Sequence, residues 1–181
     1  MPEGPEIRRA ADAIAEVLVG ERVSTVKFGQ PKLRRYAKGL KDYRVIDVET
    51  RGKAMLTHFE HGHSIYSHNQ LYGVWQVIDG HKLPKTNRSM RILLQTDLHS
   101  AILYSASDIA VLPTGELAQH PFLSKIGPDI MNPALIWRDI LARLQSDTFR
   151  RKELSGLYLD QAFLAGNGNY LRSEVLHVAG I

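Results

Sequence analysis

Residues 43–78, YRVIDVETRGKAMLTHFEHGHSIYSHNQLYGVWQVI, determine the fold class of this 181-residue chain. The stretch holds four short runs that are rich in Val, Ile, Thr and aromatic residues, with Gly or Asn between them. Such runs are typical of β-strands, and Gly and Asn are favoured in tight turns. Similar runs lie at 23–28, 90–96, 100–105 and 108–112. The spacing predicts a β-sandwich or barrel over about residues 22–112.

Helical patterns flank the predicted strands. Ile7, Ala11, Ile14 and Leu18 are spaced so that they would lie on one face of a helix, which predicts an N-terminal helix. Gly20 follows as a typical helix end. After the strands, helices are expected to begin near Thr114 and Pro133, to cover about residues 150–159, and to follow Gly168. The order helix, strands, helices predicts an α+β protein.

The composition is that of an ordinary globular protein, with 44% apolar and 23% charged residues. No stretch approaches the roughly 20 apolar residues that cross a bilayer. The first residues, MPEGPEIRRA, lack the apolar core of a signal peptide, so we expect an intracellular protein without a membrane partner. The absence of Cys excludes disulfides and thiolate metal sites. A net charge of +4 favours a nucleic-acid partner only weakly.

The N-terminus offers a nucleophile and two carboxyl groups. Removal of Met1 would expose the secondary amine of Pro2, and an α-amine has a reference pKa of roughly 7.7–8.0. A neutral amine can attack an electrophilic carbon and form an iminium ion. Glu3 and Glu6 could then donate and accept protons. The alternative is structural, because Pro and acidic residues also favour the first turn of a helix.

Two positions within the predicted β-domain could contact DNA. Lys53 follows Gly52 at a turn and could reach a phosphate or a sugar oxygen, or it could be a solvated charge. Gln70, Leu71 and Tyr72 lie between two strand-like runs, which predicts a hairpin tip. A polar, apolar and aromatic trio there could fill the gap left by an extruded base. Alternatively, its apolar members fold back onto the core.

The sequence Gly166-Asn167-Gly168-Asn169 precedes the last predicted helix. Asn169 is expected to be the N-cap residue of that helix. Its side chain, together with the exposed N–H groups of the first turn, could instead bind phosphate.

Histidine is frequent, with eight residues, and four of them lie close together at 58, 61, 63 and 68. The sequence has no HExxH motif and no carboxylate in an evident ligand register, so we expect no native metal site.

Taken together, these motifs resemble the N-terminal part of the formamidopyrimidine-DNA glycosylase family, in its bacterial branch that acts on oxidised pyrimidines. The resemblance extends along the chain and is carried by MPEGPEIRRAAD, VETRGKA, LTHF, IYSHNQLYGVW, LYSASDIAVL, HPFL, GPD and LDQAFLAGNGNYLRSE. It implies an N-terminal helix and an antiparallel β-sandwich as the catalytic domain over residues 1–125. The start of a helical DNA-binding domain, of the helix–two-turns–helix type, is implied over residues 126–181.

The resemblance also implies roles for the catalytic residues. Pro2 would be the nucleophile and Glu3 the acid and base that helps to open the deoxyribose. Glu6 would support the site, and Lys53 would hold phosphate or sugar near the lesion.

Four further residues would bind DNA according to the resemblance. Gln70, Leu71 and Tyr72 would fill the void in the double helix, and Asn169 would grip the phosphates that flank the lesion. The implied partner is double-stranded DNA with an oxidised pyrimidine or an abasic site.

The implied activity is that of a base-excision repair glycosylase and lyase, which uses a Schiff base on Pro2 and β,δ-elimination. We expect a bacterial cytoplasmic monomer that needs no cofactor for this chemistry.

The sequence departs from the family pattern in two respects. The four-cysteine finger that carries the family's structural zinc is not in these 181 residues, and Asn167 replaces an apolar residue. We therefore expect a truncated form with weak activity on duplex DNA. Two alternatives stay open: a glycosylase for oxidised purines, or a DNA-binding fragment without catalysis.

Overall fold

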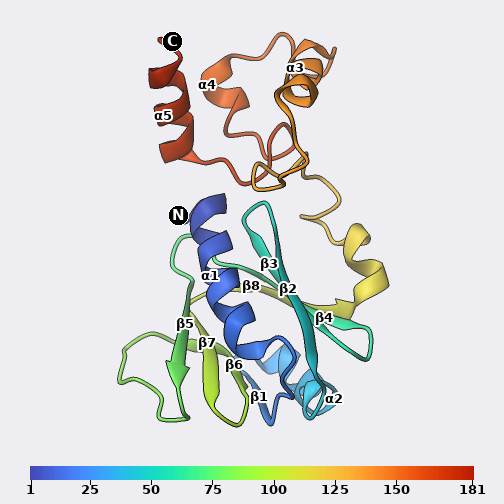
Figure 1. Cartoon of the computed structure of the whole chain (residues 1–181), viewed down its shortest axis with the longest axis vertical. Helices are drawn as coiled ribbons and strands as arrows, with labels where there is room; N and C mark the ends of the chain where they lie inside the picture. Colours follow the sequence, from blue (N-terminus) through green and yellow to red (C-terminus); the bar gives the residue numbers. More distant parts are fainter.

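The computed structural model describes all 181 residues and contains two β-sheets, one long N-terminal helix and a helical C-terminal region (Figure 1). The elements in chain order are α1 (Gly4–Leu18), β1 (Thr25–Phe28), the 3-10 helix η1 (Pro31–Tyr36), α2 (Ala37–Leu40), β2 (Val45–Arg51), β3 (Ala54–Phe59), β4 (His63–His68), β5 (Val74–Asp79), β6 (Met90–Gln95), β7 (His99–Tyr104), β8 (Asp108–Pro113), the 3-10 helix η2 (Thr114–Gln119), α3 (Trp137–Gln145), α4 (Leu154–Leu157) and α5 (Asn169–Val178).

The eight strands form two four-stranded sheets. The first has the order β1-β6-β7-β5 and the second the order β2-β3-β4-β8, and all neighbouring strands are antiparallel. The prediction of an α+β fold with antiparallel sheets is confirmed. None of the helices combines the length and the apolar character that crossing a bilayer requires.

Helix α1 contributes its predicted apolar face to the main core. Ile7, Ala11, Ile14 and Leu18 are at most 1% exposed and belong to one cluster with residues of both sheets. Burying an aliphatic side chain of this size stabilises a fold by roughly 1.5–3 kcal/mol. The helix is therefore anchored along its length, and its N-terminus has a fixed position at one end of the sheets.

Strand β3 of the second sheet is covered on both faces, which explains why none of its residues is exposed, Thr57 and His58 included. Met55 and Phe59 face the main core, whereas Leu56 packs with Leu117 and Leu123 on the opposite side. All six residues of β3 are buried. A strand covered on both faces has no solvent-facing alternation, so its sequence reads as a continuous buried run.

The C-terminal region has its own small core. Phe149, Leu157, Phe163 and Leu164 are buried together, and side chains of α3 and α4 pack around them. In Figure 1 this region lies beyond the N-terminal end of α1. We call residues 137–181 the helical lobe and residues 1–119 the sandwich lobe. The domain boundary at residue 125 stays a prediction.

The helix predicted over residues 150–159 is present but much shorter than expected. Only Leu154–Leu157 are helical, and residues 147–151 form turns. Gly156 lowers the helix propensity of the segment, and the Asp160 carboxylate accepts a hydrogen bond from Ala162 N–H that stabilises a turn instead. The helix expected to begin near Thr114 does begin there, as the 3-10 helix Thr114–Gln119. The start expected near Pro133 is wrong, since α3 begins at Trp137.

Replacement of Leu56 tests the outer core. Leu56→Ala removes a side chain that is fully buried, and we expect the free energy of unfolding to fall by about 2–5 kcal/mol. Leu98, which is 72% exposed, provides the matched control, and Leu98→Ala should change stability by less than about 0.5 kcal/mol. Urea unfolding monitored by tryptophan fluorescence measures both. Equal effects of the two substitutions would contradict the described packing.

Candidate active site

Glu3 lies where the sandwich lobe meets the helical lobe. The residue is only 4% exposed, although it directly follows the half-buried Pro2 at the start of α1. Its carboxylate accepts hydrogen bonds from the backbone N–H groups of Tyr170, at 2.7 Å, and Leu171, at 3.0 Å. These groups belong to the first turn of α5, where the helix dipole also favours a negative charge. The buried carboxylate is thus fully paired by the backbone of the other lobe.

Glu6 supports Glu3 from within α1. One Glu6 carboxylate oxygen accepts a hydrogen bond from the Glu3 backbone N–H at 2.7 Å, while the Glu6 side chain stays on the exposed side of the helix. This contact fixes the backbone that carries Glu3 and Pro2. Pro2, Glu3 and Glu6 therefore form one unit around the N-terminus of α1.

The expectation that Asn169 caps α5 with its side chain is wrong. The N-cap residue is Gly168, and Asn169 is the first helical residue. The Glu3 carboxylate occupies the position from which a capping side chain would bind the free N–H groups. Gly168 is required at this point, because a Cβ atom there would collide with the Glu3 carboxylate. Asn169 is exposed, and its side chain makes no hydrogen bond within the protein.

The loop before α5 is held by four hydrogen bonds. Gly4 N–H donates to the Gly166 carbonyl at 2.7 Å. Gln161 bonds both Gly166 N–H and the Asn167 carbonyl, at 3.1 and 2.8 Å. Asn167, which departs from the family motif, is buried and donates its amide to the Tyr158 carbonyl at 2.7 Å. The loop therefore accommodates a polar residue at this position without an unpaired donor.

Lys53 is presented by a two-residue turn between β2 and β3. Gly52, with φ +62°, allows this turn, and its N–H donates to the Asp129 carboxylate at 2.6 Å. The other Asp129 oxygen accepts the Met131 N–H at 2.8 Å. Burial lowers the pKa of Lys53, and the negative charge of Glu3 opposes that shift. The Lys53 ammonium group is therefore close enough to the Glu3 carboxylate for their charges to interact.

His68 is a site residue that the sequence reasoning did not single out. It ends β4 and pairs in register with Ala54, the neighbour of Lys53. Burial lowers the pKa of His68; the Asp108 carboxylate opposes this shift, and the Lys53 charge adds to it. Its Nδ1 accepts the Gln70 N–H at 3.0 Å. Its position two residues before the Gln70 trio was the signal available in the sequence.

The Gln70, Leu71 and Tyr72 segment is not a hairpin tip as predicted. It connects β4 of one sheet to β5 of the other. The alternative that its apolar side chains fold onto the core is also wrong, since Leu71 is 56% and Tyr72 is 70% exposed. Gly73 closes the turn against the Asn69 backbone, where no Cβ would fit. The segment is a fixed projection with two apolar side chains in solvent.

A continuous series of interactions links the candidate residues from one lobe to the other. Glu3 bonds the first turn of α5, the Glu3 charge acts on Lys53, and the Lys53 charge acts on His68. His68 in turn bonds Gln70. The structure therefore brings the predicted catalytic residues together at the junction of the lobes, with the exposed projection beside them.

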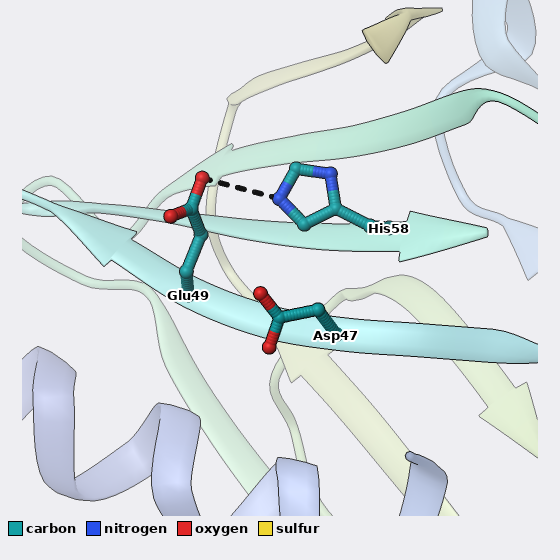
Figure 2. Close-up of side chains that lie close together, drawn as sticks. All are labelled: Asp47, Glu49 and His58. Atoms are coloured by element: carbon teal, nitrogen blue, oxygen red, sulfur yellow. Dashed lines mark hydrogen bonds and ion pairs between the residues drawn. The ribbon is translucent and has the colours of Figure 1, made fainter. Parts of the chain in front are cut away.

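A second cluster lies on β2 and β3, outside this series (Figure 2). Asp47, Glu49 and His58 each offer one potential ligand atom, and these atoms lie within 4.8 Å of one another. The expectation that no carboxylate stands in ligand register with a histidine was therefore wrong. Glu49 Oε1 lies 3.2 Å from His58 Nε2 and 3.0 Å from the Arg51 guanidinium. The hydrogen bond from His58 is the main cause of the lowered pKa of Glu49, and burial opposes it.

Comparisons with known proteins show which family the chain resembles. Residues 1–107 match the formamidopyrimidine-DNA glycosylase N-terminal domain. Over all 181 residues the chain is 50% identical to endonuclease 8 of Enterobacter sp. strain 638 and 51% identical to endonuclease 8 of Klebsiella pneumoniae strain 342. In both cases it spans 69% of the relative's length.

Solved structures of Lactococcus lactis Fpg share the fold. The complex with DNA that contains N7-benzyl-Fapy-dG gives a TM-score of 0.82 at 18% identity, over 99% of this chain and 68% of that one. The complex with abasic DNA gives 0.82 at 19% identity, over 99% and 67%.

The chain belongs to the formamidopyrimidine-DNA glycosylase family. Among its relatives at about half identity over the whole chain are the bacterial endonuclease 8 proteins.

Substitution of Gly168 tests the close packing of the Glu3 carboxylate against the start of α5. In Gly168→Ala the added methyl group must displace the Glu3 carboxylate or the backbone of α5, and we expect a loss of about 1–3 kcal/mol in the free energy of unfolding. Gly115 has open space around its Cβ position and serves as the control, with an expected change below about 0.5 kcal/mol. Thermal unfolding of both variants measures the difference. A neutral Gly168→Ala variant would contradict the close approach of Glu3.

Proposed function

We propose that this chain is a base-excision repair DNA glycosylase and AP lyase that acts on oxidised pyrimidines in double-stranded DNA, with Pro2 as its nucleophile. The observation that carries the proposal is the buried Glu3 carboxylate next to Pro2, paired with the first turn of α5 and close to the charge of Lys53. Family membership supports the reaction class. The DNA complexes of the Fpg structures support damaged or abasic DNA as the partner.

The first chemical step needs a free Pro2 nitrogen, and therefore the removal of Met1. The neutral amine attacks C1′ of the damaged nucleotide, and the base departs with the electron pair of the broken bond and takes up a proton. The proline nitrogen loses its own proton to the Glu3 carboxylate. Glu3 then delivers that proton to O4′ as the C1′–O4′ bond breaks and the proline nitrogen forms a C1′=N⁺ iminium bond. Glu3 is suited to this role because its position is fixed and it lies beside Pro2.

Strand cleavage follows from the positive charge of the iminium. The cation makes the C2′ proton acidic, and its loss expels the 3′ phosphate by β-elimination. A second, δ-elimination expels the 5′ phosphate, and water releases the sugar from Pro2. Lys53 would offer its positive charge to the departing phosphates or to the sugar oxygens. No step in this scheme requires a cofactor.

Access to C1′ requires that the damaged nucleotide leaves the base stack. Extrusion costs a few kcal/mol, and a damaged base lowers that cost. Leu71 and Tyr72 project into solvent beside the series that ends at Gln70, so they can enter the vacated space. Asn169, exposed at the start of α5, is available to bind a flanking phosphate. The preference for pyrimidines over purines rests on the resemblance of this segment to the pyrimidine branch.

Borohydride trapping tests the nucleophile. We expect the chain with a free Pro2 to form a covalent adduct with a thymine-glycol duplex at low salt, because borohydride reduces the iminium to a stable amine. Pro2→Gly should retain only a small part of this product, and a form that keeps Met1 should give none. Denaturing gels and intact-mass spectra measure the adduct.

The same assay separates the alternatives. Stronger trapping on an 8-oxoguanine duplex would favour a purine enzyme. DNA binding without any adduct in the processed chain would favour a non-catalytic module.

Truncation of the exposed projection tests lesion extrusion. Leu71→Ala and Tyr72→Ala should each slow adduct formation on a lesion duplex by roughly tenfold, equivalent to about 1.4 kcal/mol. They should leave thermal stability unchanged, because both side chains are exposed. Trapping on a single-stranded abasic oligonucleotide needs no extrusion and should be affected far less. An equal loss on both substrates would assign these residues to general DNA binding instead.

A further inference from the structure

We propose that Asp47, Glu49 and His58 form a binding site for a divalent transition-metal ion of the zinc type. The site lies on the outer face of the β2–β3 pair, separate from Glu3 and Lys53. It is independent of the proposed glycosylase chemistry, which uses no residue of this cluster.

The local register of the strands creates the cluster. Val45 pairs with Phe59, and a β-bulge at Ile46 then places Asp47 directly opposite His58. Glu49 follows two residues later, and side chains at i and i+2 of a strand share a face. Without the extra residue, a hydrophobic side chain would stand opposite His58. The bulge therefore brings two carboxylates and one imidazole to the same face.

His58 is held from outside the cluster, which is the second and independent observation. The residue is 7% exposed, and its Nδ1 lies 2.7 Å from Ser64 Oγ, which lies 2.7 Å from Thr114 Oγ1. A histidine that binds a metal through one nitrogen usually donates its other N–H to a fixed acceptor. Ser64 Oγ provides that acceptor for Nδ1–H. Nε2 then faces the Glu49 carboxylate at 3.2 Å, with the Asp47 carboxylate nearby (Figure 2).

The donor set selects the class of ion. One imidazole nitrogen and two carboxylate oxygens suit Zn²⁺ and neighbouring transition metals, whereas Ca²⁺ and Mg²⁺ favour sites made of oxygen alone. Zinc bonds to these atoms measure about 2.0–2.2 Å, so Asp47 must swing inward, which its exposed position allows. Three protein ligands leave the fourth position of a tetrahedral site to water.

Access and charge are both compatible with an ion. A surface cavity is lined by the three ligands together with Thr114 and Leu117, so a hydrated ion can reach them. The ligand set contains two acidic side chains, which can offset the charge of a divalent cation. Arg51 is the competing partner of Glu49, but it is itself 44% exposed, and an ion pair of that kind holds its partner weakly.

Zinc titration of the tag-free 181-residue chain tests the site. The chain has no Cys, so thiolates cannot contribute to binding. We expect isothermal titration calorimetry to show one saturable equivalent of Zn²⁺ and the melting temperature to rise with zinc. Asp47→Asn should weaken binding by at least about tenfold. Because Asp47 is exposed, this variant should keep the circular-dichroism spectrum and the metal-free melting temperature of the parent.

Asp79 provides the matched control. It is an exposed carboxylate 3.6 Å from His99 on the other sheet, without a second carboxylate ligand, and Asp79→Asn should leave zinc affinity unchanged. Ser64→Ala should weaken binding through His58, again by about tenfold.

Two results would overturn the proposal. The first is the absence of saturable zinc binding in the parent chain. The second is binding that persists unchanged in both Asp47→Asn and Glu49→Gln, which would place the ion at other histidines and leave the Glu49–His58 contact as a structural pair.

Discussion

The pairing of the Glu3 carboxylate with the first turn of α5 is the interaction on which the arrangement of the lobes depends. A carboxylate that is almost completely buried must be hydrogen-bonded, because an unpaired buried charge is strongly destabilising. Only the helical lobe supplies its partners, through Tyr170 and Leu171. The same contact uses backbone donors at the helix start that would otherwise lack partners. Each lobe therefore satisfies a polar requirement of the other.

Other contacts reinforce this junction and consist largely of backbone groups. Gly4 bonds Gly166, and Gly52 bonds the Asp129 carboxylate, so both the start of α1 and the turn that carries Lys53 are fixed to the chain beyond the sandwich lobe. The glycines are needed for two reasons: a positive φ at Gly52 and close packing at Gly168. The extensive core between α1 and the two sheets holds the other end of this assembly. The large apolar core between α1 and the two sheets thus holds in place the few polar groups that join the sandwich lobe to the rest of the chain.

Local patterns in the sequence predicted the elements well and their connections poorly. The spacing of Ile7 to Leu18 identified α1, since a helix face repeats within a few residues, and the β-rich runs identified the strands. The sequence could not show that Gln70 to Tyr72 link two sheets, because strand order depends on contacts distant in the chain. It also placed the N-cap of α5 at Asn169, since a carboxylate from residue 3 cannot be anticipated from the local sequence.

In the candidate site, too, local features could be predicted from the sequence and long-range contacts could not. Its residue types could be named in advance, because Pro2, Glu3, Lys53 and Asn169 lie in short, recognisable motifs. The structure was needed to bring Glu3 and Lys53 to one place, to add His68, and to set Asp47 opposite His58. The last of these depends on a single extra residue in β2, which reverses the faces of all positions before it relative to those after it. No periodicity calculated along one strand would reveal this pairing.

The exposure of Met1 bears on the stage at which the protein becomes reactive. Met1 is 56% exposed, whereas Glu3, two residues later, is almost completely enclosed. On the proposed chemistry, the reactive amine does not exist until the bond between Met1 and Pro2 is cut, yet every contact that positions it involves residues from Glu3 onward. The scaffold can therefore assemble around an inert terminus. On this scheme, removal of the exposed Met1 would convert an unreactive form into the reactive one, so reactivity would depend on when that bond is cut as well as on the fold.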